Sequence, residues 1–327
     1  MRLLALLFAF LLPQTAFAVC SGTDLRDTLT DAERAAIADY RASTPFAQGN
    51  HWLARRDGQS IHIIGTMHLD DPRWPPIVER LKPVVEQAEL LMVEMTDEEQ
   101  QRMQQELARN PEFMFITDGP TLPDRMEADD WDRLSQAMRE RGMPPFMVAK
   151  TQPWFLSLLL GIPACAMAQG EAAQNGLDKR LIAIAEASDV PRAGLEGYEM
   201  LISLLADLPV EEQLDMLLAS LPMAEQADDQ FATVAAQYFD EDSAGAWGMA
   251  QVIARRSPDM TEAEIAAVMQ DLQDRLLDRR NSAWMDEILG RTETRIVIAV
   301  GALHLMGESG LLNYLQQAGY TLERQPF

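Results

Sequence analysis

Two short segments near opposite ends of the chain share one pattern, an apolar run followed by Gly-x-x-His. Residues 61–68 read Ile-His-Ile-Ile-Gly-Thr-Met-His, and residues 296–304 read Ile-Val-Ile-Ala-Val-Gly-Ala-Leu-His. The glycines and histidines of these motifs are Gly65, His68, Gly301 and His304. In α/β sheets, ligands bind beyond the carboxyl ends of parallel strands, where a glycine permits a sharp turn and a close approach. If both runs are central parallel strands, the two histidines converge on one crevice.

A histidine in one such motif is most often a partly buried residue with no part in chemistry. Two copies in a chain with four histidines favour a functional role for His68 and His304. We assign the other two, His51 and His62, to structure, because they lie within a predicted hairpin.

Two acidic residues end similar apolar runs. Glu94 follows residues 91–93, Leu-Met-Val, and Glu196 follows residues 193–195, Ala-Gly-Leu. A carboxylate in this position is a reasonable metal ligand or general base. The alternative is an ordinary acid at the start of a helix, which the helix dipole favours. Two histidines with one or two carboxylates match the ligand set of divalent metal sites, although these four residues are far apart in the sequence.

The sequence also predicts the elements that position these residues. The predicted strands are 51–56, 59–64, 89–95, 191–195, 295–300 and 320–324, and the predicted helices are 25–41, 75–88, 98–109, 130–141, 154–169, 177–187, 210–221, 225–239, 262–289 and 309–318. Strand–helix–strand order over residues 59–95 favours a parallel pair with a right-handed crossover. The simplest architecture is an α/β (α+β) fold, with a central mixed sheet formed from both ends of the chain and a large helical insertion over roughly 97–289.

Composition limits the partners of this chain. It has 327 residues, 47% of them apolar, and a formal net charge of −24 that is spread along the sequence. A chain of this length and apolar content can bury a sizeable core. Because an acidic surface repels phosphate backbones, we expect no nucleic-acid partner.

The first 18 residues predict an export signal. Met1 and Arg2 give a positive start, residues 3–12 are apolar, and Ala16-Phe17-Ala18 is a small-x-small cleavage site. We therefore expect a periplasmic or secreted mature chain that begins at Val19 and has no integral membrane segment. A retained membrane anchor is disfavoured, because the apolar run of residues 3–12 is too short to span a bilayer comfortably. Residues 19–50 would be an N-terminal extension and 51–327 the main domain.

Cleavage at this site leaves two cysteines, Cys20 and Cys165. An oxidising compartment favours a disulfide between them, and two independent thiols are the alternative. A lipid anchor on Cys20 is disfavoured, because the preceding residue is a valine. The chain has no Cys-x-x-Cys motif, so nothing supports thiol redox catalysis or a cysteine-type zinc site.

Several further segments give the motifs a family context. They are Gly65-Thr66-Met67-His68, Val93-Glu94, Gln152-Pro153-Trp154, Asn175-Gly176-Leu177-Asp178, Gly194-Leu195-Glu196, Arg280-Asn281-Ser282-Ala283-Trp284 and Val300-Gly301-Ala302-Leu303-His304-Leu305-Met306-Gly307. In this order, over residues 51–324, the sequence resembles the TraB/GumN family, which includes the animal TIKI proteins. The resemblance implies a fold similar to that of erythromycin esterase-like and ChaN-like haem-binding proteins. It also implies metal-dependent proteolysis, as in TIKI proteins, with manganese or cobalt.

The resemblance assigns roles by position. His68, Glu94, Glu196 and His304 would be direct metal ligands, Arg280 and Asn281 supporting polar groups, and Asp178 a further candidate. Arg280 could stabilise an oxyanion, although it also fits a surface arginine within a charged run. The chain departs from the family at Gly197, where many relatives have threonine, and this leaves the local substrate contacts open.

These patterns lead to one main functional hypothesis and two alternatives. The main hypothesis is a periplasmic metal-dependent hydrolase, most consistent with a peptidase acting on a peptide or small-molecule substrate. His68 and His304 would hold a manganese, cobalt or zinc ion, and Glu94 or Glu196 would act as the base. The first alternative is a non-enzymatic envelope protein that binds haem, a metal or a small ligand in the same crevice. The second is an interaction domain built on the helical insertion, in which neither histidine matters.

Overall fold

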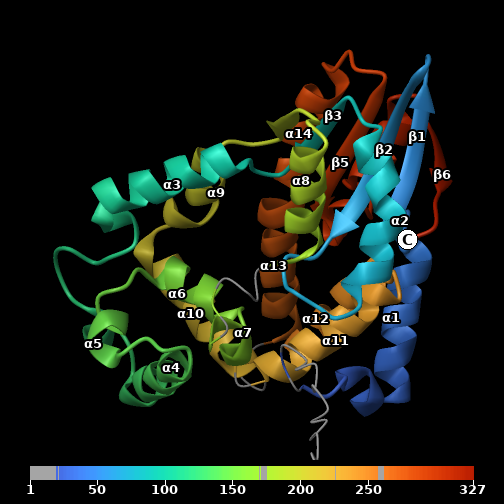
Figure 1. Ribbon diagram of the computed structural model, residues 1–327. Helices are drawn as coiled ribbons and strands as arrows, with labels where there is room; N and C mark the ends of the chain where they lie inside the picture. The colour runs from blue at the N-terminus through green and yellow to red at the C-terminus, as the bar shows by residue number, and fades with distance from the viewer. Residues whose placement is uncertain (1–19, 21, 169, 171–174, 225, 257–260) are drawn as a thin grey trace, which may run out of the picture.

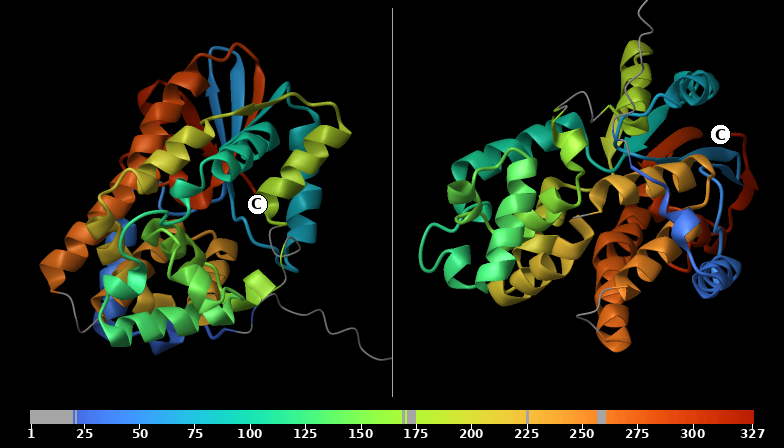
Figure 2. Two further views of the ribbon diagram at one scale, coloured as in Figure 1. Left: turned by 90° about the vertical axis from the view of Figure 1, so that its left-hand side faces the viewer. Right: turned by 90° about the horizontal axis from the view of Figure 1, so that it is seen from below.

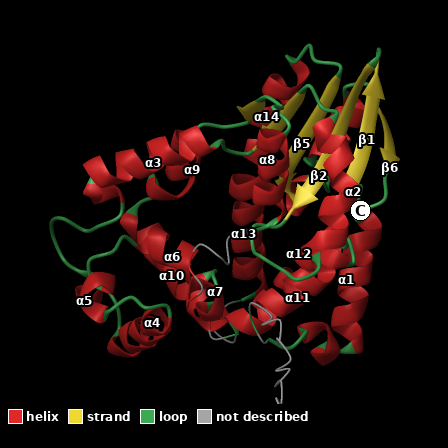
Figure 3. Ribbon diagram, in the orientation of Figure 1, coloured by secondary structure: helices red, strands yellow, loops and turns green. Residues whose placement is uncertain are grey.

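The protein folds as a mixed α/β structure around one six-stranded sheet (Figures 1 and 3). The computed structural model describes residues 20, 22–168, 170, 175–224, 226–256 and 261–327. The predicted signal peptide and the cleavage site before Val19 lie outside the described residues. No helix in the described part of the chain combines the length and hydropathy that a bilayer crossing requires.

The sheet is built from both ends of the chain, as the sequence predicts. Its strands are β1 (His51–Arg56), β2 (Gln59–Thr66), β3 (Leu90–Val93), β4 (Arg192–Gly194), β5 (Arg295–Gly301) and β6 (Thr321–Arg324), in the order β4-β3-β5-β2-β1-β6. The predicted hairpin is confirmed, because β1 pairs antiparallel with β2. The strands β2 and β3 are parallel but do not pair with each other. Instead β5, from the C-terminal end, lies between them and pairs with both.

The register places both Gly-x-x-His motifs at one edge of the sheet. Gly65 lies opposite Val300, and Thr66 lies opposite Gly301, at the carboxyl ends of the parallel strands β2 and β5. A Cβ atom at Gly65 would lie 3.0 Å from the Cα atom of Ala302. The glycine of the first motif therefore lets the chain of the second pack closely against it.

Helices cover both faces of the sheet and make it a three-layer structure. On one face, α14 (Arg279–Leu289) and α15 (Leu311–Gln317) pack against side chains that include Ile61 and Ile63. On the other face, α2 (Trp74–Glu86) and α8 (Leu177–Ala187) pack against side chains that include Ile64. The central strands are buried on both sides, which explains their nearly continuous apolar sequences.

The middle of the chain is mostly helical and forms a lobe beside the sheet (Figure 2). Its helices are α3 (Asp97–Arg109), α4 (Ala128–Glu140), α5 (Pro145–Val148), α6 (Pro153–Leu160), α7 (Ala164–Ala168), α9 (Tyr198–Ala206), α10 (Val210–Ala224), α11 (Ala227–Phe239), α12 (Ser243–Arg255) and α13 (Glu262–Gln273). The lobe has an apolar core of its own, with Leu134, Leu156 and Leu217 fully buried. One predicted helix, 154–169, is two helices, because Gly161 and Pro163 interrupt it.

The N-terminal segment is attached to this helical part at several points. After a 3₁₀ turn (Leu25–Thr28), α1 (Asp31–Ser43) begins with a capping box between Thr30 and Glu33. The apolar side chains of this segment pack against α12. Cys20 and Cys165 form a disulfide that connects the segment to α7, which agrees with the pairing that export favours.

Candidate functional site

The predicted site residues gather where the parallel strands end. Glu94 follows β3, Glu196 lies two residues after β4, and His304 follows β5 in a 3₁₀ turn (Ala302–His304). The helix α14 brings Arg280 and Asn281 to the same place. His68 lies in the loop after β2, next to Asp178 of α8.

Arg280 lies at the centre of this arrangement. Its Nη2 donates to Glu94 Oε2 at 2.7 Å and to Glu196 Oε1 at 2.5 Å, and its Nε donates to Glu196 Oε2 at 3.0 Å. Its Nη1 lies 3.2 Å from His304 Nε2 and also donates to the Leu276 carbonyl. All five N–H donors of the guanidinium are therefore engaged, and Arg280 is buried, unlike a surface helix arginine.

The carboxylate of Glu196 accepts three hydrogen bonds from its neighbours. Oε1 accepts from Arg280, and Oε2 accepts from both Arg280 and the Trp284 indole N–H, which lies at 2.9 Å. Only 2% of the side chain is exposed. Trp284 belongs to the quoted motifs but was not predicted as a site residue. Its position four residues after Arg280, on the same helix face, is the signal that could have found it.

Glu94 is less completely engaged than Glu196. Its Oε1 accepts from the Gly301 backbone N–H at 2.7 Å, and its Oε2 accepts from Arg280. Burial favours the neutral acid, but the positive charges around Glu94 and the Gly301 N–H outweigh this effect and hold the pKa of Glu94 below its usual value. Each oxygen keeps one lone pair without a protein donor. Because one guanidinium faces two carboxylates, the cluster keeps one uncompensated negative charge.

The hydrogen bonds around His304 determine its tautomer. Asn281 Nδ2 donates to the carbonyls of His304 and Ser309, so the Asn281 Oδ1 atom faces His304 Nδ1 at 2.7 Å. His304 Nδ1 must then carry the proton, and its Nε2 presents a lone pair toward Arg280 and Glu94. Burial lowers the pKa of His304 to about 4, so the ring is neutral at pH 7.

His68 differs from His304 in exposure and charge. Its side chain is 65% exposed, and its Nδ1 lies 3.3 Å from Asp178 Oδ2. The hydrogen bond to Asp178 raises the pKa of His68 to about 9. The charge of His68 also acts on Glu94 and His304, so these groups share one electrostatic environment. Within the described part of the chain, no hydrogen bond to His68 Nε2 is found.

The donors of this site are not gathered tightly around one point. Among the described residues, only Cys20, Cys165 and Asp228 bring three potential ligand atoms within 4.8 Å of one another, and the two cysteines are joined in the disulfide. The candidate ligands near Arg280 are therefore more widely spaced than a closed metal site. His68 is the exposed member of the set and has the most freedom to turn.

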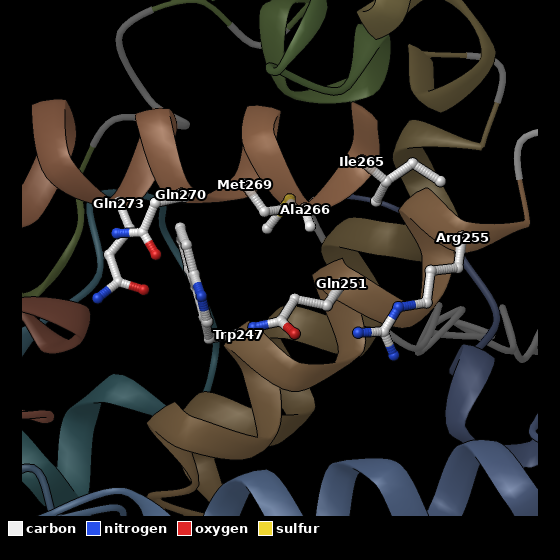
Figure 4. A pocket seen from close by; sticks show the side chains of 8 residues that line it. All are labelled: Trp247, Gln251, Arg255, Ile265, Ala266, Met269, Gln270 and Gln273. Carbon is white, nitrogen blue, oxygen red and sulfur yellow. The ribbon is translucent and has the colours of Figure 1, made fainter. Parts of the chain in front are cut away.

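A separate groove lies between α12 and α13, away from these residues (Figure 4). Trp247 and Arg255 of α12 face Met269 of α13 across it. The groove is lined by glutamine, apolar and arginine side chains and contains none of the predicted site residues. It adds no acid, base or nucleophile to the candidate site.

Comparison with known proteins places the chain in a family. It is 26% identical over 286 residues to the uncharacterized protein YbaP of Escherichia coli K12, and this match covers 85% of the chain and 98% of YbaP. The uncharacterized protein YbaP of Shigella flexneri matches with the same identity and coverage. A family model matches residues 50–324, which include the strands and every residue of the Arg280 cluster. The chain belongs to the TraB/PrgY/gumN family.

Proposed function

We propose that this protein is a metal-dependent hydrolase that acts on peptide bonds at the site formed by His68, Glu94 and His304. One observation carries the proposal: the two motif histidines face a shared, negatively charged environment, and each has a polar side chain from outside the sheet within 3.3 Å of its Nδ1. Asp178 anchors His68, and Asn281 anchors His304. Metal-binding histidines are oriented in this way, with the second nitrogen donating to a carboxylate or carbonyl.

His68 Nε2, His304 Nε2 and the carboxylate of Glu94 are donors of the types that hold a divalent cation, and His68 would have to turn toward the other two to complete the set. Glu94 keeps a free lone pair on each oxygen, and the cluster carries a surplus negative charge. In this proposal Glu196 is not a ligand, because it already accepts three hydrogen bonds from Arg280 and Trp284 and only 2% of its side chain is exposed. Manganese, cobalt and zinc are the candidate ions, and such an ion polarises a carbonyl and activates water.

The remaining residues orient the site and determine the charge state of Glu94. Glu196 holds Arg280 in place, and Arg280 together with the Gly301 N–H keeps Glu94 ionised, as a metal-ligating carboxylate must be. All N–H groups of Arg280 are engaged, so its role toward an oxyanion requires release of the Nη1–H that now meets His304. We place this activity outside the cytoplasm, because the sequence predicts an export signal and a disulfide is typical of oxidising compartments.

Metal binding by the mature chain, purified without a histidine tag, tests the proposal. The parent should bind manganese, cobalt or zinc with a stoichiometry of one in titration calorimetry and should cleave a peptide library in a chelator-sensitive manner. His68→Ala and His304→Ala should each abolish both properties, because one remaining imidazole and a carboxylate chelate poorly. His62→Ala is the matched control, since His62 lies in β2 outside the cluster, and it should bind and cleave like the parent.

A second candidate function follows from the contact between Arg280 and His304. Because the guanidinium already satisfies His304 Nε2 and two carboxylates, the cluster is stable without a cation. This favours a binding protein that holds a small ligand at the same site. A parent protein that binds none of the three metals and cleaves no peptide would contradict the hydrolase and leave this alternative.

A further inference from the structure

The segment 175–178 is fixed to the loop that carries His68. The backbone N–H of Gly176 donates to the His68 carbonyl at 3.1 Å, and the N–H of Leu177 donates to the Met67 carbonyl at 3.0 Å. The helix α8 begins directly at Leu177. The start of this helix is therefore attached to the loop after β2 at two successive residues.

This attachment requires glycine at position 176. A Cβ atom there would overlap the Met67 carbonyl oxygen and the His68 carbonyl group. These are backbone atoms at the end of a central strand, so they cannot move aside cheaply. Glycine thus permits the approach that brings the first turn of α8, with Asp178, to the imidazole of His68.

The contacts of Asp178 do not fit an ordinary helix-starting acid. Its Oδ2 lies 3.3 Å from His68 Nδ1, and α8 has no side-chain cap hydrogen bond. Its Oδ1 is buried and has no hydrogen-bond partner among the described residues. A buried acceptor left without a donor is unfavourable, and the contact with His68 is what the other oxygen of this carboxylate provides.

We propose that Asp178 is a positioning residue that holds the Nδ1–H of His68, so that Nε2 is left with a free lone pair when the ring is neutral. Asn281 holds Nδ1 of His304 in the corresponding way. Each Gly-x-x-His motif therefore has its own anchor from a covering helix, α8 on one face of the sheet and α14 on the other. The consequence for metal affinity rests on the function proposed above, whereas the consequence for the His68 tautomer does not.

The first test measures the tautomer of His68 by nitrogen-15 NMR, without metal, at a pH well above the His68 pKa of about 9, so that the ring is neutral. The chain has four histidines, so His68→Asn assigns the signal. In the parent the proton should be on Nδ1. In Asp178→Ala it should move to Nε2, the preferred tautomer of an unrestrained imidazole. Asp178→Asn keeps an acceptor oxygen and should retain the parent tautomer.

The second test measures the dissociation constant of the metal for the same variants. Asp178→Ala should weaken binding about 10- to 100-fold, the usual effect of losing an anchoring partner, and Asp178→Asn should weaken it less. Asp70→Asn is the control. It also removes a carboxylate near this loop, but Asp70 pairs with Arg180 and not with His68. An unchanged His68 tautomer in Asp178→Ala would overturn the proposal. A parent that binds no metal would contradict the proposed function. The His68 tautomer measured by NMR would still test the role of Asp178.

Discussion

At the scale of single residues, Arg280 determines how the other site residues are arranged. It is the only group of the cluster that contacts Glu94, Glu196 and His304 together. Its side chain is 9% exposed, so its charge is expensive to bury without partners. Both glutamates depend on Arg280, because in the described part of the chain no other side chain that is cationic at neutral pH forms an ion pair with either of them.

Replacing this arginine should destabilise the fold strongly. Arg280→Met leaves two carboxylates buried without their cation, and removal of one partner from a buried pair costs about 3–5 kcal/mol. Arg279→Met is the matched control: its side chain is 59% exposed and pairs with Asp274 at the surface, where such pairs contribute about 0–1 kcal/mol. Urea unfolding of both variants measures the difference. Equal unfolding free energies for the two variants would show that the fold does not depend on the ion pairs of Arg280.

The sequence predicted the members of the site better than their contacts. The duplicated motif and the strand-end acids indicated His68, His304, Glu94 and Glu196. Their contacts depend on distances across the fold, and no local pattern showed that Arg280 would occupy both oxygens of Glu196. The roles of these residues in metal binding and catalysis stay predictions.

At the scale of elements, the parallel pairing of β2 with β5 brings the two ends of the chain together. Nearly continuous apolar runs predicted the central strands, and the hairpin turn predicted the pairing of β1 with β2. The position of β5 between β2 and β3 results from pairing between segments that are distant in the sequence, and the local sequence does not determine it. Strand order therefore had to come from the structure.

The helical segment before Arg280 contains a second feature that its sequence does not reveal. Periodicity predicted one helix over 262–289, but a π-helical turn (Asp274–Asp278) joins α13 to α14. Arg280 Nη1 bonds the Leu276 carbonyl within this turn. Single π turns inside helices are frequent at functional sites, and this one immediately precedes Arg280 and Asn281.

The hairpin β1–β2 contains a pair of histidines that should make the fold sensitive to acid. His51 Nδ1 donates to the Pro326 carbonyl, so His51 Nε2 accepts from His62 Nδ1 at 2.9 Å. Burial lowers the pKa of His62 to about 4, with further contributions from the charges of His51 and Arg55. Protonation of His51 would place two N–H donors face to face and break this chain of hydrogen bonds.

The free energy of unfolding should therefore fall as the pH falls from about 6.5 toward 4. In that window the unfolded chain binds a proton at His62 and the folded protein does not, so stability increases with pH. Urea unfolding at about pH 7.5 and about pH 5, with a chelator present, measures the effect. His62→Gln removes this titration and should lose less stability between the two pH values than the parent does. An equal loss in the parent and in His62→Gln would exclude the histidine pair as a source of acid sensitivity.

At the scale of the whole molecule, the N-terminal segment joins parts of the chain that are distant in sequence. Near the disulfide, the Thr23 N–H donates to Asp229 Oδ1 at 2.6 Å, and the Leu25 N–H donates to Thr233 Oγ1 at 2.7 Å. Leu25 is also buried against the side chains of α1 and α12. The covalent bond therefore reinforces contacts that already hold the segment to α11.

Loss of the disulfide should destabilise the protein without detaching this segment. The bond closes a loop with a sequence separation of 145 residues. For a loop of that length the chain-entropy model gives about 5 kcal/mol, an upper figure because native strain offsets part of it. The double variant Cys20→Ser, Cys165→Ser avoids a lone reactive thiol and should unfold at lower urea than the parent. Reduction of the parent should lower its midpoint to that of the double variant and leave the midpoint of the variant unchanged. Two reactive thiols per chain in the native, non-reduced parent would show that the bond does not form.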